Sequence, residues 1–93
     1  MIDKQRRLTL KRNLVSRTEI GPNATIFLYY NPLKNVVVIR EDDNTSVEEE
    51  YFVTSVKLNT YRMQFPIELF KCFSKVNLLP TEKNGTIYIW IMP

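Results

Sequence analysis

The chain has 93 residues, enough to bury the core of one compact domain and too few for two independent ones. Hydrophobic residues make up 44% of it and the aromatic and β-branched ones gather in strand-like runs, so we expect a folded domain. No apolar run approaches the roughly 20 residues that would cross a bilayer. Residues 1–4 begin no apolar signal segment. We therefore expect a cytoplasmic protein without a membrane partner.

The residue types that most enzymes use are scarce. There is no histidine, which removes the usual general base and the commonest zinc ligand. Cys72 is the single cysteine, so it forms no internal disulfide and lacks the histidine that a thiol nucleophile ordinarily needs. Gly21 and Gly85 lie too far apart to form a phosphate-binding loop. We expect a protein that is not an enzyme and that uses no metal, cofactor or small-molecule substrate.

The small net charge of +3 hides a strong asymmetry along the chain. Residues 1–40 carry eight basic and two acidic side chains, residues 41–50 carry six acidic and no basic ones, and residues 51–93 carry five basic and two acidic ones. A basic face attracts polyanions, although solvated lysine and arginine on a globular surface would give the same composition. We interpret the chain as one domain with a first half (1–40), an acidic connector (41–50) and a second half (51–93).

In the first half, residues 8–10 alternate as a short strand does, and residues 13–20 fit a short helix. The cluster Gly21-Pro22-Asn23 ends this helix. Residues 24–30 are rich in β-branched and aromatic types, and residues 36–40 form the returning strand, which predicts an antiparallel hairpin.

The acidic segment is best interpreted as a solvated connector between the halves. Its alternatives are a cation site or a mimic of nucleic-acid charge. The segment lacks both the ligand spacing and the glycine of a calcium loop.

The second half begins with two predicted strands, at residues 51–56 and 61–65. Pro66 suits the first turn of a helix, and the apolar spacing that follows predicts about two helical turns ending near Lys75. Residues 76–80 are expected to be extended, and residues 81–85 to form a turn that contains the favourable dipeptide Asn84-Gly85.

The final strand, at residues 86–92, carries apolar side chains on both faces, which predicts a central or covered position in a sheet.

One pattern occurs twice. Arg7-Leu8-Thr9-Leu10, followed by Leu14, is echoed by Arg62-Met63-Gln64-Phe65, followed by Leu69. Each copy leads through a short amphipathic stretch into strands, and two such units can bury their apolar faces against each other. The chain is therefore predicted to be mainly β with two short helices, folded as a small single-domain β-barrel of two pseudo-symmetric halves.

The stretch from Arg62 to Lys71 resembles the signature of AbrB/MazE-type swapped-hairpin proteins, in its MraZ-like form with two copies in one chain. The matching residues are Arg62, Phe65, Pro66, Glu68, Leu69 and Lys71. Phe70 departs from the pattern, and in the weaker first copy Lys11 replaces the proline and Asn13 the glutamate. The acidic-then-arginine motif of the MraZ-like group is missing. The resemblance implies swapped-hairpin halves and DNA binding by dimers.

Carried over to this chain, the resemblance implicates Arg62, Lys71 and Arg7 in DNA binding. Local charge adds Arg6, Lys11, Arg12 and Arg17. Arginine would bind phosphates or guanine edges and lysine would supply point charge. Six to eight contacts would give a logarithmic salt slope on the order of −5 to −7. Arg62 has a structural alternative, which is to pair with Glu68.

The leading hypothesis is therefore a small DNA-binding transcription regulator, with DNA favoured over RNA. One alternative is an RNA- or single-strand-binding β-barrel that stacks bases on the tyrosines Tyr29, Tyr30, Tyr51, Tyr61 and Tyr88. Another is a protein-interaction module such as an antitoxin. The two copies are compatible with one pseudo-dimer within the chain and with a homodimer that swaps between chains.

Overall fold

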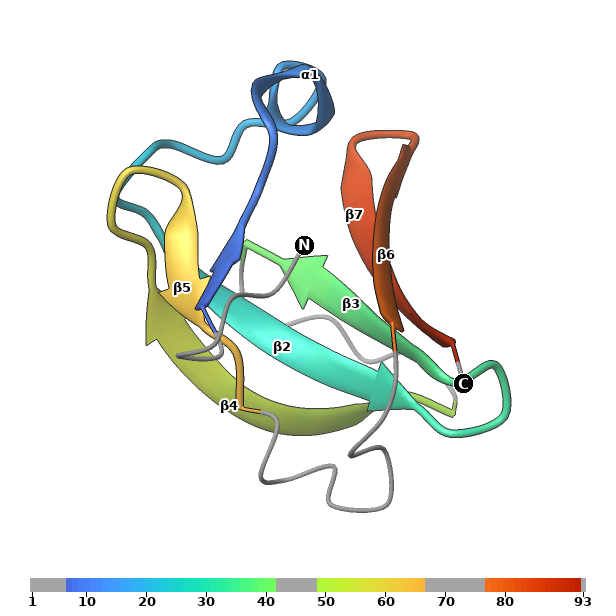
Figure 1. The fold of residues 1–93 in the computed structure, drawn as a ribbon. Coiled ribbons are helices and arrows are strands. Elements are labelled where there is room, and N and C mark those ends of the chain that lie inside the picture. Colours follow the sequence, from blue (N-terminus) through green and yellow to red (C-terminus); the bar gives the residue numbers. More distant parts are fainter. Residues whose placement is uncertain (1–6, 42–48, 67–76, 93) are drawn as a thin grey trace.

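The computed structural model describes residues 7–41, 49–66 and 77–92, and these are mainly β (Figure 1). The first part contains β1 (Arg7–Thr9), α1 (Arg12–Val15), β2 (Thr25–Asn31) and β3 (Val36–Arg40). The second part contains β4 (Tyr51–Lys57), β5 (Arg62–Gln64), β6 (Asn77–Lys83) and β7 (Thr86–Met92). Most of the acidic connector and the predicted helix after Pro66 lie outside the described residues.

The strands form two antiparallel sheets. Five of them make one sheet in the order β4-β2-β3-β7-β6, and β1 pairs with β5 in a separate two-stranded ribbon. The predicted barrel is wrong, because the larger sheet is open with β4 and β6 at its edges. Strands β1 and β5 have three residues each and pair with one another, so they do not link those two edges.

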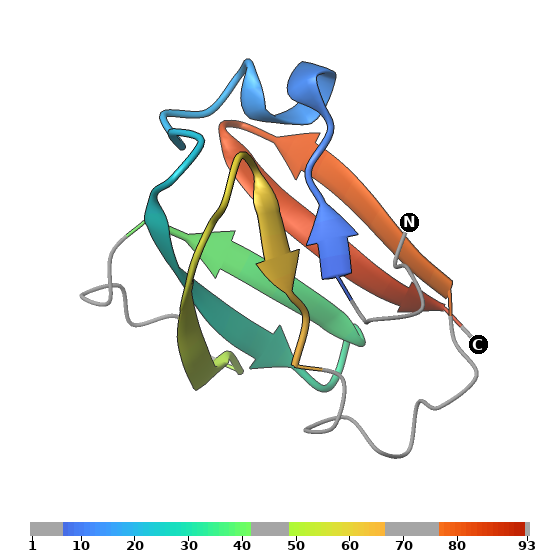
Figure 2. The same cartoon turned by 60° about the vertical axis from the view of Figure 1, so that its left-hand side comes forward.

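The main core lies between the ribbon and one face of the five-stranded sheet. Figure 2 shows β1 and β5 side by side in front of the larger sheet. Leu8 and Met63 of the ribbon are buried in one cluster with Ile26, Ile39 and Ile89 of the sheet. Alternation along each strand places these apolar side chains on the same side, which is the period-2 pattern of a half-buried strand.

The opposite face of the sheet, here called the outer face, carries a second apolar cluster. Its members are Phe27, Tyr29, Val36, Val38, Tyr88 and Trp90. Strand β7 lies between β3 and β6 and contributes to both clusters. Strand β7 thus has a strand neighbour on each side, which confirms the prediction of a central or covered position.

The first helix is shorter than predicted. It spans Arg12–Val15 rather than residues 13–20. The Thr18 hydroxyl donates a hydrogen bond to the Val15 carbonyl at 2.9 Å and accepts one from the Ile20 amide at 3.2 Å. These local bonds compete with helical ones, so the chain leaves the helix after a single turn.

Residues 81–83 belong to β6, so the turn predicted over 81–85 is narrower than expected. Lys83 pairs with Thr86, which leaves Asn84 and Gly85 as a two-residue loop. Their φ angles of 54° and 81° suit the hairpin turn that asparagine-glycine pairs favour. Pro80 lies inside β6, an edge strand where the missing N–H is tolerated. No helix among the described residues is long and apolar enough to cross a membrane.

Candidate nucleic-acid interface

The β1–β5 ribbon brings the two copies of the sequence repeat together. Leu8 pairs with Met63, Arg7 with Gln64, and Thr9 with Arg62. Leu8 and Met63 are 0% and 2% exposed and point into the core. Because neighbouring residues in a strand point to opposite faces, the other four lie on the face away from the core. Thr9, Arg62 and Gln64 are exposed there and Arg7 is half-buried.

Bonds at one end of the ribbon hold it in place. The Leu10 amide donates to the Tyr61 carbonyl and the Tyr61 amide donates to the Pro22 carbonyl, both at 2.8 Å. The Thr60 amide donates to the side-chain oxygen of Asn23 at 3.1 Å. Thr60 and Tyr61 have φ angles of 50° and 62°, so the chain turns sharply before β5. The ribbon is thereby tied to the loop before β2.

Two further predicted site residues follow β1 directly. Lys11 and Arg12 are exposed at the start of α1, after the buried Leu10. Within residues 7–41, 49–66 and 77–92, neither of them pairs with a carboxylate, and the same holds for Arg62. The structural alternative for Arg62, a pair with Glu68, falls outside the described residues. The predicted site residues that lie on the ribbon and its continuation are Arg7, Lys11, Arg12 and Arg62.

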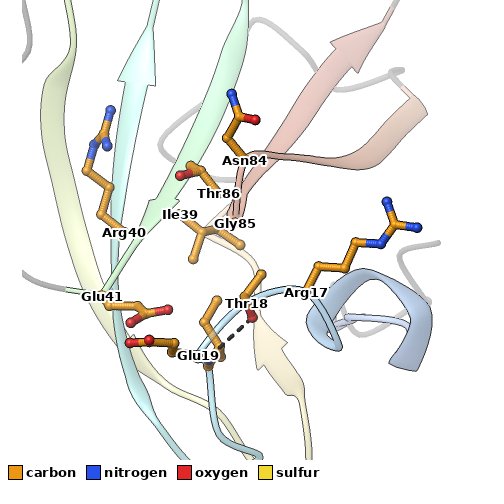
Figure 3. A pocket seen from close by; sticks show the side chains of 10 residues that line it. Arg17, Thr18, Glu19, Ile39, Arg40, Glu41, Asn84, Gly85 and Thr86 are labelled. Atoms are coloured by element: carbon orange, nitrogen blue, oxygen red, sulfur yellow. Dashed lines mark hydrogen bonds between the residues drawn. The ribbon is translucent and has the colours of Figure 1, made fainter.

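Arg17 lies apart from the ribbon. It borders a pocket of about 400 Å³ between the loop after α1, the end of β3 and the β6–β7 turn. Figure 3 shows its guanidinium directed away from Glu19 and Glu41, which also line this pocket. Its Nη1 is 3.9 Å from Oε1 of Glu82, and its side chain is 79% exposed. The mixed charges of this pocket do not form an anion site.

Arg40 is engaged within the fold. Its guanidinium donates three hydrogen bonds of 2.8 to 3.1 Å to the Glu50 carboxylate and lies 5.9 Å from the ring centre of Tyr29. The two charged side chains are 19% and 8% exposed. Of the remaining predicted residues, Arg6 and Lys71 lie outside the described part of the chain.

Thr9 and Gln64 are not among the site residues predicted from the sequence, although they share a face with the ribbon's arginines. Each lies directly opposite one of the ribbon's arginines, on the same exposed face. The alternation around Leu8 and Met63 could have indicated this shared face, since it places residues 7, 9, 62 and 64 on one side of a pair of strands.

The outer face holds a groove of about 260 Å³ whose lining includes Lys34, Lys83, Tyr88 and Trp90. The rings of Tyr88 and Trp90 are stacked at 6.5 Å with an angle of 28°. Tyr29 also lies on this face, beside Phe52.

The other tyrosines named from the sequence lie elsewhere. Tyr30 and Tyr61 pack against the main core, and Tyr51 is 64% exposed at the start of β4.

No group of three or more potential metal-ligating side chains occurs in the part of the chain that the structure describes. Comparison of the sequence with family models and with curated proteins gives no match, and comparison of the fold with solved structures gives none either.

Proposed function

We propose that this protein is a small DNA-binding regulator that places its β1–β5 ribbon against duplex DNA. One observation carries the proposal: Arg7 and Arg62 lie on the same outward face of a two-stranded antiparallel ribbon. A two-stranded ribbon has the width that the major groove admits. Arginine on such a ribbon reaches guanine edges or phosphates bidentately.

The surroundings of the ribbon support this role. Its inward side chains, Leu8 and Met63, are buried in the core, and this packing fixes the position of the outward face. Lys11 and Arg12 continue from β1 and would contact the flanking phosphates. Each phosphate contact releases counterions, so binding should weaken steeply as salt is added.

The pairing of the two halves supports the swapped-hairpin resemblance. The hairpins β2–β3 and β6–β7 meet through β3 and β7, and the short strands β1 and β5 that precede them in each half also pair. A two-fold axis relating the halves would produce both pairings. On this proposal one chain supplies the two-fold arrangement that other DNA-binding proteins obtain by dimerisation.

Fluorescence anisotropy with labelled random-sequence duplexes tests the proposal. We expect binding at about 50 mM salt that weakens at least tenfold by about 200 mM, as several phosphate contacts require. Absence of binding to any duplex at the lower salt would refute it.

A second candidate, single-stranded nucleic-acid binding, is favoured by the outer-face groove. Stacked Tyr88 and Trp90 would offer a ring surface for bases, with Lys34 and Lys83 near the backbone. The same titration with single strands discriminates between the two surfaces. Tighter binding to single strands that is weakened by Lys34→Ala, and unchanged by Arg62→Ala, would favour the groove over the ribbon.

A further inference from the structure

The register of the ribbon is symmetric about the Leu8–Met63 pair. A two-fold axis through this pair exchanges Arg7 with Arg62 and Thr9 with Gln64, because their partners are Gln64 and Thr9 respectively. The first exchange replaces an arginine by an arginine. The second replaces a threonine by a glutamine, so the exposed face departs from symmetry at these two positions.

We propose that Thr9 and Gln64 are specificity-determining residues that make the ribbon prefer a DNA site with two unlike halves. This inference rests on the proposed function and concerns the same surface. One half-site would face Arg7 and Gln64, and the other Arg62 and Thr9. The arginines would then contact equivalent bases in the two halves, and Thr9 and Gln64 would contact different ones.

The chemistry of the four side chains defines the expected bases. Arginine binds the O6 and N7 acceptors of guanine, and glutamine binds N6 and N7 of adenine. The methyl group of threonine packs on the methyl group of thymine, and the hydroxyl of threonine can donate or accept a hydrogen bond at several base edges. The half-site facing Arg7 and Gln64 should thus contain guanine and adenine. The half-site facing Arg62 and Thr9 should contain guanine and prefer thymine.

The geometry of the strands keeps the two half-sites close together. Residues two apart in a strand are separated by about 6.8 Å, which is roughly two base-pair steps. Directly opposed side chains in an antiparallel pair have their Cβ atoms about 5 Å apart. Each arginine and its cross-strand neighbour can therefore contact adjacent base pairs, and the whole face would cover a short central site.

Selection of preferred sequences from a pool of random duplexes tests this inference, using the full chain and two variants. Thr9→Gln makes both halves of the face arginine-glutamine, and Gln64→Thr makes both halves arginine-threonine. We expect the wild-type protein to select a site with two unlike halves. Thr9→Gln should select a palindrome of one half, and Gln64→Thr a palindrome of the other.

Affinities for the three selected sites give the size of the effect. Each protein should bind its own site roughly 5- to 100-fold more tightly than a site with one unmatched half. Thr9 and Gln64 are both exposed, so thermal unfolding should show that each variant retains the wild-type fold.

The outcomes distinguish a failure of the role of Thr9 and Gln64 from a failure of duplex binding by the ribbon. If both variants select the wild-type site, or if the wild-type site is itself palindromic, the role of Thr9 and Gln64 is refuted while DNA binding by the ribbon stands. If no protein binds duplex, or if all three bind single strands more tightly, the proposed function fails and this inference fails with it.

Discussion

Leu8 of the first strand lies directly opposite Met63 of the fifth, and both side chains are buried against the five-stranded sheet. The two residues are 55 positions apart in the chain and occupy the same place in the repeated pattern. Their contact with the core determines which face of the ribbon is turned outward. The outward placement of Arg7 and Arg62 therefore depends on two buried apolar residues.

Leu8→Ala should destabilise the protein by about 2–5 kcal/mol, because it leaves a cavity under the ribbon. Urea unfolding followed by circular dichroism measures the free energy of unfolding. Leu33→Ala is the matched control, since Leu33 is 74% exposed in the β2–β3 turn and its truncation should change stability by less than about 0.5 kcal/mol. Equal losses in the two variants would contradict the assigned core.

Glu50→Ala should destabilise the fold by about 3–5 kcal/mol, because it leaves the Arg40 guanidinium largely buried without its carboxylate. Thermal and urea unfolding give the loss. For comparison, Arg17→Ala removes a partner from a long, exposed ion pair and should cost less than about 1 kcal/mol. If Glu50→Ala lowers the free energy of unfolding no more than Arg17→Ala does, the Arg40–Glu50 pair does not stabilise the fold.

Gly85→Ala should cost about 1–2 kcal/mol, because its φ of 81° is unfavourable for any residue with a Cβ atom. The added atom would lie 3.5 Å from the Arg17 carbonyl, an ordinary contact, so the backbone angle alone produces the loss.

Gly21→Ala supplies the control for this turn, since a Cβ there meets nothing within 4 Å and the residue has no positive φ. Its unfolding midpoint should stay at or above that of the wild type. If Gly21→Ala lowers stability as much as Gly85→Ala, the positive φ of Gly85 does not explain the loss in stability.

Arg62→Ala should weaken duplex binding and reduce the logarithmic salt slope by about one if its main contact is to phosphate. If it contacts a base, the loss should instead be largest on the selected site, about 1–3 kcal/mol. Lys34→Ala makes the same change in net charge from the exposed β2–β3 turn and should leave duplex binding nearly unchanged. Equal effects would mean that net charge, and not the ribbon, determines binding.

Much of the strand content could be predicted because alternation and β-branched composition act locally. Residues 36–40 and 86–92 occupy the strands that the sequence indicates. The helix was predicted too long because the Ile20 amide donates to the Thr18 hydroxyl instead of to a helical carbonyl, and apolar spacing does not reveal this bond. The barrel prediction failed because strand count and closure depend on pairing between distant segments.

The candidate site was predictable only in part, because charge and sequence repeats are visible in the sequence and the register between distant strands is not. The arginines Arg7 and Arg62 stood out by charge and by their place in the repeat. Thr9 and Gln64 became visible only when the register placed each opposite an arginine.

Both outer strands of the large sheet carry features that discourage further strand addition. Pro80 has no amide hydrogen to donate to a strand added beside β6. The register shift opposite Leu28 and Tyr29 interrupts the regular pairing of β4. Copies of the chain should therefore resist joining edge to edge into fibrils, even at concentrations where bare sheet margins commonly aggregate.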